Sequence, residues 1–117
     1  MKKILVSFLT IFSLSAFAKE NITIIYGFNA ADNAANYSRA LADEANKIQN
    51  KYNFMFDVKP GAGQVVAYNY VKDRSDTIFM TSGAYWLRPV VYPTQSYEPR
   101  EFRSIMTIDR KSTRLNS

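Results

Sequence analysis

Three short segments of the chain carry residue types that bind small anions. They are a polar loop at 28–33, a glycine turn at 60–63 and a hydroxyl-bearing turn at 81–83. Each precedes a stretch of helical pattern, so each can present free backbone N–H groups at the positive end of a helix dipole. Glycine lets the backbone approach a bound group closely, and Thr and Ser hydroxyls can donate hydrogen bonds to an oxyanion. Together the segments would cradle a carboxylate or a phosphate without a cationic side chain.

Each segment also has a simpler structural interpretation. Gly61 and Gly63 can form an ordinary strand-to-helix turn, since this turn lacks the lysine and the glycine spacing of nucleotide-binding motifs. Asp32 and Ser82 are candidate helix N-caps. The combination of the three segments nevertheless predicts a ligand site that has no catalytic group and no metal. The candidate ligand-binding residues are Phe28, Asn29, Ala31, Asp32, Asn33, Gly61, Ala62, Gly63, Thr81, Ser82 and Gly83.

The composition of the chain removes most catalytic chemistry. Its 117 residues include neither Cys nor His, which excludes thiolate and imidazole metal ligands, disulfides, a Cys nucleophile and a Ser-His-Asp triad. We therefore expect neither an enzyme nor a cofactor. The net charge of +5 belongs mainly to the two ends, because residues 19–108 contain ten basic and nine acidic side chains. A basic face for nucleic acid is accordingly not expected.

The N-terminus is typical of a cleavable export signal at 1–18. Lys2 and Lys3 precede an apolar run at 4–14, and the small residues Ala16 and Ala18 form a cleavage site. A membrane anchor is the alternative, but the apolar run is short for a bilayer core about 30 Å thick. We expect cleavage after Ala18 and a mature protein in the periplasm, with no Cys available to carry a lipid.

The rest of the chain alternates between strand and helix patterns. Strands rich in β-branched and aromatic residues are expected at 21–28, 54–58, 77–80 and 102–108. The order of the elements, β-α-β-α-β-α-β, predicts an α/β fold with a mainly parallel sheet and flanking helices. In such a sheet the three anion-binding segments follow the carboxyl ends of three strands, where ligands bind.

Helices are expected at 34–52, 64–72 and 84–91, each between two of those strands. The first has apolar side chains at helical spacing, which predicts a face that packs on the sheet. The apolar positions of that face are Ala34, Tyr37, Ala40, Leu41, Ala45, Ile48 and Tyr52.

The ordered set of motifs from Asn21 to Ile108 resembles the N-terminal part of substrate-binding proteins of the tripartite tricarboxylate transporter system, the Bug family. The segment 58–63 is similar to the family's valine, two-residue, Pro-Gly-Ala-Gly signature, and 81–83 is similar to its Ser-Gly turn. The export signal and the segments 22–28, 39–44, 77–80, 88–89 and 97–102 carry the rest of the likeness. Two features depart from the pattern: the loop at 29–35 lacks the usual prolines and Gly-Gly pair, and Gln64 replaces a glycine.

The resemblance implies a two-lobed binding protein that closes about a hinge, of which residues 19–108 would form part of the N-terminal lobe. It implies a small carboxylate as ligand, membrane permease subunits as partners, a monomeric state and no enzymatic activity. The alternatives are a periplasmic sensor component that presents a ligand, and a secreted α/β hydrolase using Ser82. The polar, basic segment 109–117 is typical of non-native sequence or of a disordered tail.

Overall fold

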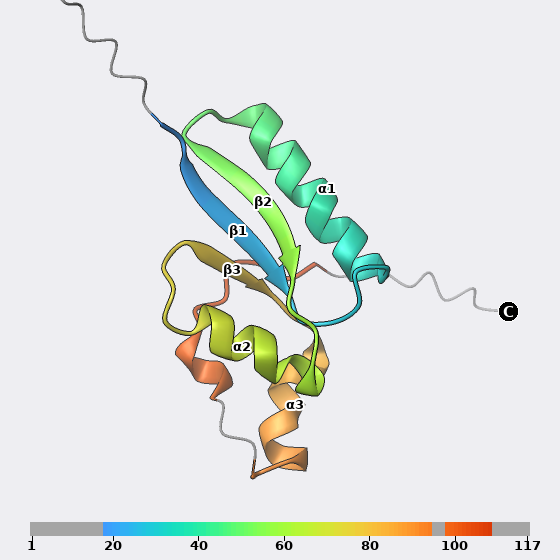
Figure 1. Ribbon diagram of the computed structural model, residues 1–117. Coiled ribbons are helices and arrows are strands. Elements are labelled where there is room, and N and C mark those ends of the chain that lie inside the picture. The colour runs from blue at the N-terminus through green and yellow to red at the C-terminus, as the bar shows by residue number, and fades with distance from the viewer. Residues whose placement is uncertain (1–17, 95–97, 109–117) are drawn as a thin grey trace, which may run out of the picture.

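A computed structural model describes residues 18–94 and 98–108 of the chain (Figure 1). The expected export signal, apart from Ala18, and the segment 109–117 lie outside these residues. Within the described part, the protein is an α/β fold built on a three-stranded parallel sheet. The strands are β1 (Glu20–Tyr26), β2 (Tyr52–Val58) and β3 (Thr77–Met80), in the spatial order β2-β1-β3.

β1 is the central strand, and its apolar sequence fits that place. Ile24, Ile25 and Tyr26 are all buried, although successive side chains of a strand point to opposite faces of the sheet. The central strand of a parallel sheet is covered on both faces, so a nearly continuous apolar run is required there. The expected buried strand in this region is thus confirmed.

Helices cover both faces of the sheet (Figure 1). α1 (Asn33–Ile48) lies along β2, while α2 (Val65–Val71) and α3 (Gly83–Val91) lie on the opposite side. Ile25 packs with Ala67 and Val71 of α2, and Phe79 of β3 joins this cluster. Two short 3-10 helices, η1 (Ala62–Gln64) and η2 (Pro99–Glu101), complete the described elements. Within the described residues, no helix is both long enough and apolar enough to cross a bilayer.

The buried face of α1 differs from the expected one. The helix packs on the sheet through Ala35, Ser38 and Ala42, whereas Leu41 is 37% and Ile48 is 82% exposed. Small side chains let the helix backbone come close to the strands, and the larger side chains of Leu41 and Ile48 lie outside this contact. The buried Ser38 hydroxyl donates a hydrogen bond to the Ala34 carbonyl at 2.8 Å, so its burial carries little penalty.

α1 also ends earlier than expected, because side-chain hydrogen bonds separate it from β2. Gln49 follows the helix with extended backbone, and its Oε1 accepts a hydrogen bond from the Tyr52 N–H at 2.8 Å. Tyr52 therefore begins β2 and does not belong to the helix. Asn46 forms a second link, since its amide donates to the Phe54 carbonyl and accepts from the Phe54 N–H, both at 2.8 Å. This pair of bonds satisfies backbone groups of an edge strand.

The strand expected at 102–108 is wrong. Phe102 packs instead against the rings of Tyr68 and Phe79, with centroids 5.8 and 5.7 Å away. The Tyr68 hydroxyl donates to a Glu101 carboxylate oxygen at 2.6 Å, which holds η2 beside α2. Residues 103–108 run as exposed irregular chain, because among the described residues no strand pairs with them.

Candidate functional site

The carboxyl ends of the three strands lie in one row. Tyr26, the last residue of β1, is opposite Val58 of β2 and Met80 of β3. The three segments singled out from the sequence consequently start side by side, as the parallel topology predicts. The loop after β1 leads to α1 on one face, whereas the loop after β2 leads to α2 on the other. Because these two loops diverge, a gap opens above the ends of β1 and β2.

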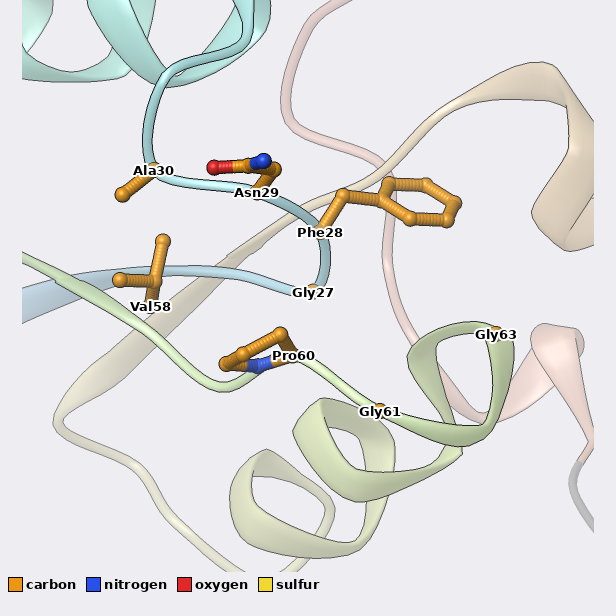
Figure 2. A pocket seen from close by; sticks show the side chains of 8 residues that line it. All are labelled: Gly27, Phe28, Asn29, Ala30, Val58, Pro60, Gly61 and Gly63. Carbon is orange, nitrogen blue, oxygen red and sulfur yellow. The ribbon is translucent and has the colours of Figure 1, made fainter.

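An open pocket of about 560 Å³ occupies this gap. Figure 2 shows residues 27–30 of the first loop on one side of it and residues 58–63 of the second on the other. The pocket is lined by Gly27, Phe28, Asn29, Ala30, Val58, Pro60, Gly61 and Gly63. Since three of these are glycines and one is alanine, much of the wall is backbone, which suits recognition of a small polar ligand by N–H and C=O groups.

The structure brings together four of the eleven candidate residues at this pocket: Phe28, Asn29, Gly61 and Gly63. The others lie outside its wall. They are Ala31, Asp32, Asn33, Ala62, Thr81, Ser82 and Gly83. Gly27, Ala30, Val58 and Pro60 are wall residues that sequence reasoning did not select. Ala30 and Pro60 lie inside the segments 28–33 and 60–63, and extending each segment back to the end of its strand would have included Gly27 and Val58.

The glycine turn has an unusual backbone. Four successive residues have positive φ: Gly61 at 133°, Ala62 at 46°, Gly63 at 58° and Gln64 at 79°. A left-handed conformation costs a non-glycine residue about 1–2 kcal/mol. Ala62 and Gln64 both bear that cost, so the surrounding packing must hold the turn in place.

Gln64 provides the packing that joins the three loops. Its side chain is buried at 2% exposure, and its Oε1 accepts a hydrogen bond from the Thr81 hydroxyl at 2.8 Å. The stem of the side chain lies directly over Gly27, where an added Cβ would come within 2.8 Å of Gln64 Cγ. One residue of the second loop thus contacts the first and the third. From the sequence, Gln64 was expected only as the first residue of a helix and as a departure from a glycine pattern, and not as a link between loops.

The first loop is held by hydrogen bonds of its own. The Asn29 side chain accepts from the Ala31 N–H at 3.0 Å, and the Tyr26 hydroxyl donates to Asp32 Oδ2 at 3.1 Å. Burial, and secondarily the Asp32 carboxylate, raises the pKa of Tyr26 above its ordinary value. Asp32 does occupy the N-cap position of α1, but its carboxylate accepts from Tyr26 and Asp32 does not line the pocket.

The third segment plays a structural part in this arrangement. Thr81 binds Gln64, and Ser82 is the N-cap residue of α3, with its carbonyl accepting from the Tyr85 N–H at 3.0 Å. A Cβ added to Gly83 would meet open space. The three loops were expected to line one ligand pocket together. In the structure two of them line it, and the third supports the second loop through the Thr81–Gln64 hydrogen bond.

Two arginines contact the pocket wall from outside it, although the expected cradle contained no cation. Arg39 of α1 donates a hydrogen bond to the Ala30 carbonyl at 2.8 Å. The guanidinium of Arg88, from α3, lies against Gly63, since a Cβ on that glycine would collide with it. Over residues 18–94 and 98–108, no cluster of three or more His, Cys, Asp or Glu side chains could bind a metal ion.

Comparisons of the chain with protein-family models, with curated proteins and with solved structures find no match. The geometry of the pocket, and the motifs of the sequence, are accordingly the basis for any functional proposal.

Proposed function

We propose that this protein is a solute-binding component that captures a small carboxylate in the pocket between the β1–α1 and β2–α2 loops. The observation that carries the proposal is the position and make-up of this pocket. It lies at the carboxyl edge of a parallel sheet, and four of its lining residues, Gly27, Ala30, Gly61 and Gly63, have no side chain beyond Cβ. That edge is where α/β folds bind ligands, and backbone N–H groups that face such a site can bind an anion.

The wider assignment rests on the motifs of the sequence. The resemblance at 58–63 and 81–83 supports a lobe of a two-lobed binding protein that delivers its ligand to membrane permease subunits. The export signal pattern at 1–18 supports a periplasmic location. In this proposal a second lobe would supply the opposite side of the cleft, which agrees with a pocket that is open on one side. A sensor component would use the same pocket, and the gene neighbourhood would separate the two roles.

The hydrolase alternative is less well supported. Ser82 is exposed and does not line the pocket, and the chain contains no His to act as its base. The pocket wall itself offers Asn29 as its one polar side chain. This composition suits binding better than chemistry.

Ligand-dependent thermal stabilisation tests the proposal. A ligand at ten times its Kd should stabilise the chain by about 1.4 kcal/mol, which raises the melting temperature of a domain of this size by roughly 6–11 °C. Citrate, succinate, benzoate and glutamate cover the main carboxylate classes. If the wild-type chain is stabilised by none of them at concentrations up to tens of millimolar, the proposal is wrong.

The substitution Gly61→Val locates the binding site, with Gly83→Val as its matched control. A side chain at Gly61 would reach Val66 at 3.0 Å and force a residue with φ of 133° into strain, whereas a side chain at Gly83 meets open space. We expect the ligand-induced shift to vanish in the first variant and persist in the second. Phe28→Ala, which removes a wall side chain and leaves the turn intact, provides an independent check if Gly61→Val unfolds.

A further inference from the structure

We propose that Phe28 and Asn29 make this pocket selective for a carboxylate attached to an aromatic ring, with the carboxylate bound by the Asn29 amide and the ring packed against Phe28. The inference rests on the proposed carboxylate-binding function and deepens it, because it names the class of carboxylate. Its basis is the set of side chains at the pocket. One amide lies next to one aromatic ring, and among the described residues that line the pocket none carries a charge.

Asn29 is held in one orientation by the first loop. Its Oδ1 accepts a hydrogen bond from the Ala31 N–H at 3.0 Å, and its main-chain carbonyl accepts from the Asp32 N–H at 3.1 Å. The side-chain oxygen is therefore occupied, whereas the Nδ2 group has no hydrogen-bond partner within the part of the chain that the structure describes. Since a carboxylate can only accept hydrogen bonds, the exposed Asn29 amide offers it two N–H donors.

Phe28 is the aromatic side chain of the pocket wall, and it is half-buried. The buried Tyr26 ring meets its ring at a centroid distance of 5.8 Å and an interplanar angle of 64°. Tilted contacts of this kind are favourable between aromatic rings, so Tyr26 holds the Phe28 ring in place. Figure 2 shows this ring extending from the first loop toward the end of the pocket where Gly63 lies. Because Asn29 is the next residue, a ligand bound by its amide can place a ring against Phe28.

The rest of the wall suits an apolar ligand body. Val58 and Pro60 line the pocket with apolar side chains, while Arg39 and Arg88 contact the wall from outside and are not among the lining residues. A ligand ring that enters this pocket leaves water for an apolar surface, which is favourable. The volume of about 560 Å³ lies within the roughly 300–1,000 Å³ that small-molecule sites commonly have, and it accommodates a single aromatic ring.

Calorimetric titration of the 117-residue chain with benzoate, cyclohexanecarboxylate and butanoate tests the inference. All three acids carry the same charge near neutral pH, the first two have the same number of carbons, and butanoate has no ring. We expect benzoate to bind about 10- to 100-fold more tightly than butanoate, because the apolar wall buries its ring. We expect it to bind about 2- to 10-fold more tightly than cyclohexanecarboxylate, because only an aromatic ring makes the favourable ring–ring contact with Phe28.

Substitutions at the two residues separate their roles. Phe28→Leu removes the ring and keeps an apolar side chain, so it should abolish the preference for benzoate over cyclohexanecarboxylate. Asn29→Asp keeps an oxygen that can accept from the Ala31 N–H but replaces the N–H donors with a negative charge, so it should weaken benzoate binding by about 10-fold or more. Asn50→Asp is its matched control, because it introduces the same charge at an exposed position between α1 and β2, at the opposite edge of the sheet.

The outcomes distinguish this inference from the function on which it rests. Equal affinity of the wild-type chain for benzoate and either of the other two acids would overturn the inference and leave the proposed function intact. A preference that survives in Phe28→Leu would overturn it as well, as would a loss of benzoate binding in Asn29→Asp no larger than that in Asn50→Asp. Circular dichroism of each variant confirms the wild-type fold. Binding of none of these acids, nor of citrate or glutamate, would overturn the proposed function itself.

Discussion

Gly27→Ala should destabilise the fold through one identifiable contact. The added Cβ would lie 2.8 Å from Gln64 Cγ, 2.9 Å from Gln64 Cβ and 3.2 Å from Ala67 Cβ. Gln64 cannot move away easily, since it is buried and its amide is bound to Thr81. Overpacking of this kind costs about 1–3 kcal/mol, and with two of the contacts under 3 Å we expect about 2 kcal/mol.

A second substitution identifies the source of that cost. Gln64→Gly removes both of the shortest contacts, and it also places glycine at a φ of 79°. In this background only the contact with Ala67 remains, so Gly27→Ala should cost less than about 1 kcal/mol. The two substitutions should therefore show a coupling energy of about 1–1.5 kcal/mol in a double-mutant cycle.

Urea-induced unfolding measures these energies, followed by circular dichroism and by the fluorescence of Trp86, the single tryptophan. Unchanged m-values across the four proteins would show that only stability is altered. If Gly27→Ala costs as much in the Gln64→Gly background as in the wild type, Gln64 is not what requires glycine at position 27. The explanation that Gln64 joins the loops by packing on Gly27 would then be refuted.

Three further predictions concern other parts of the fold. Asn46→Ala should lower the free energy of unfolding by about 1–3 kcal/mol, because it leaves two backbone groups of Phe54 without their partners. Urea unfolding measures this loss, and a value below about 0.5 kcal/mol would contradict the prediction. The hydrogen bond to Glu101, and then burial, raises the pKa of Tyr68 above its ordinary value of 10.0. The stability that the Tyr68 hydroxyl contributes is therefore complete below pH 10.0 and is lost as pH rises through the folded-state pKa. Tyr68→Phe should therefore reduce the fall in stability on alkaline titration, and an unchanged pH profile would argue against the contact. Val90→Gln should change stability by less than about 0.5 kcal/mol in the same urea assay, since Val90 is 79% exposed, and a larger loss would mean that this side chain is covered.

The sequence alone determined the class of fold and the edge of the sheet where the pocket lies. Runs of β-branched and aromatic residues predicted β1, β2 and β3, and the helices between them required parallel pairing. Parallel pairing in turn brings the carboxyl ends of the strands into one row. These conclusions depend on local pattern and on topology, and both can be derived from residue types and spacing.

Only the tertiary structure decided which side chains meet. Apolar spacing predicted a buried Ile48, yet α1 packs through smaller residues such as Ser38, because the distance between helix and sheet depends on both surfaces. The link from Gln64 to Thr81 and the approach of Arg88 to Gly63 join positions 17 and 25 residues apart. No periodicity encodes such contacts. They arise where divergent loops and opposing helices come together, and those contacts determine the shape of the pocket wall.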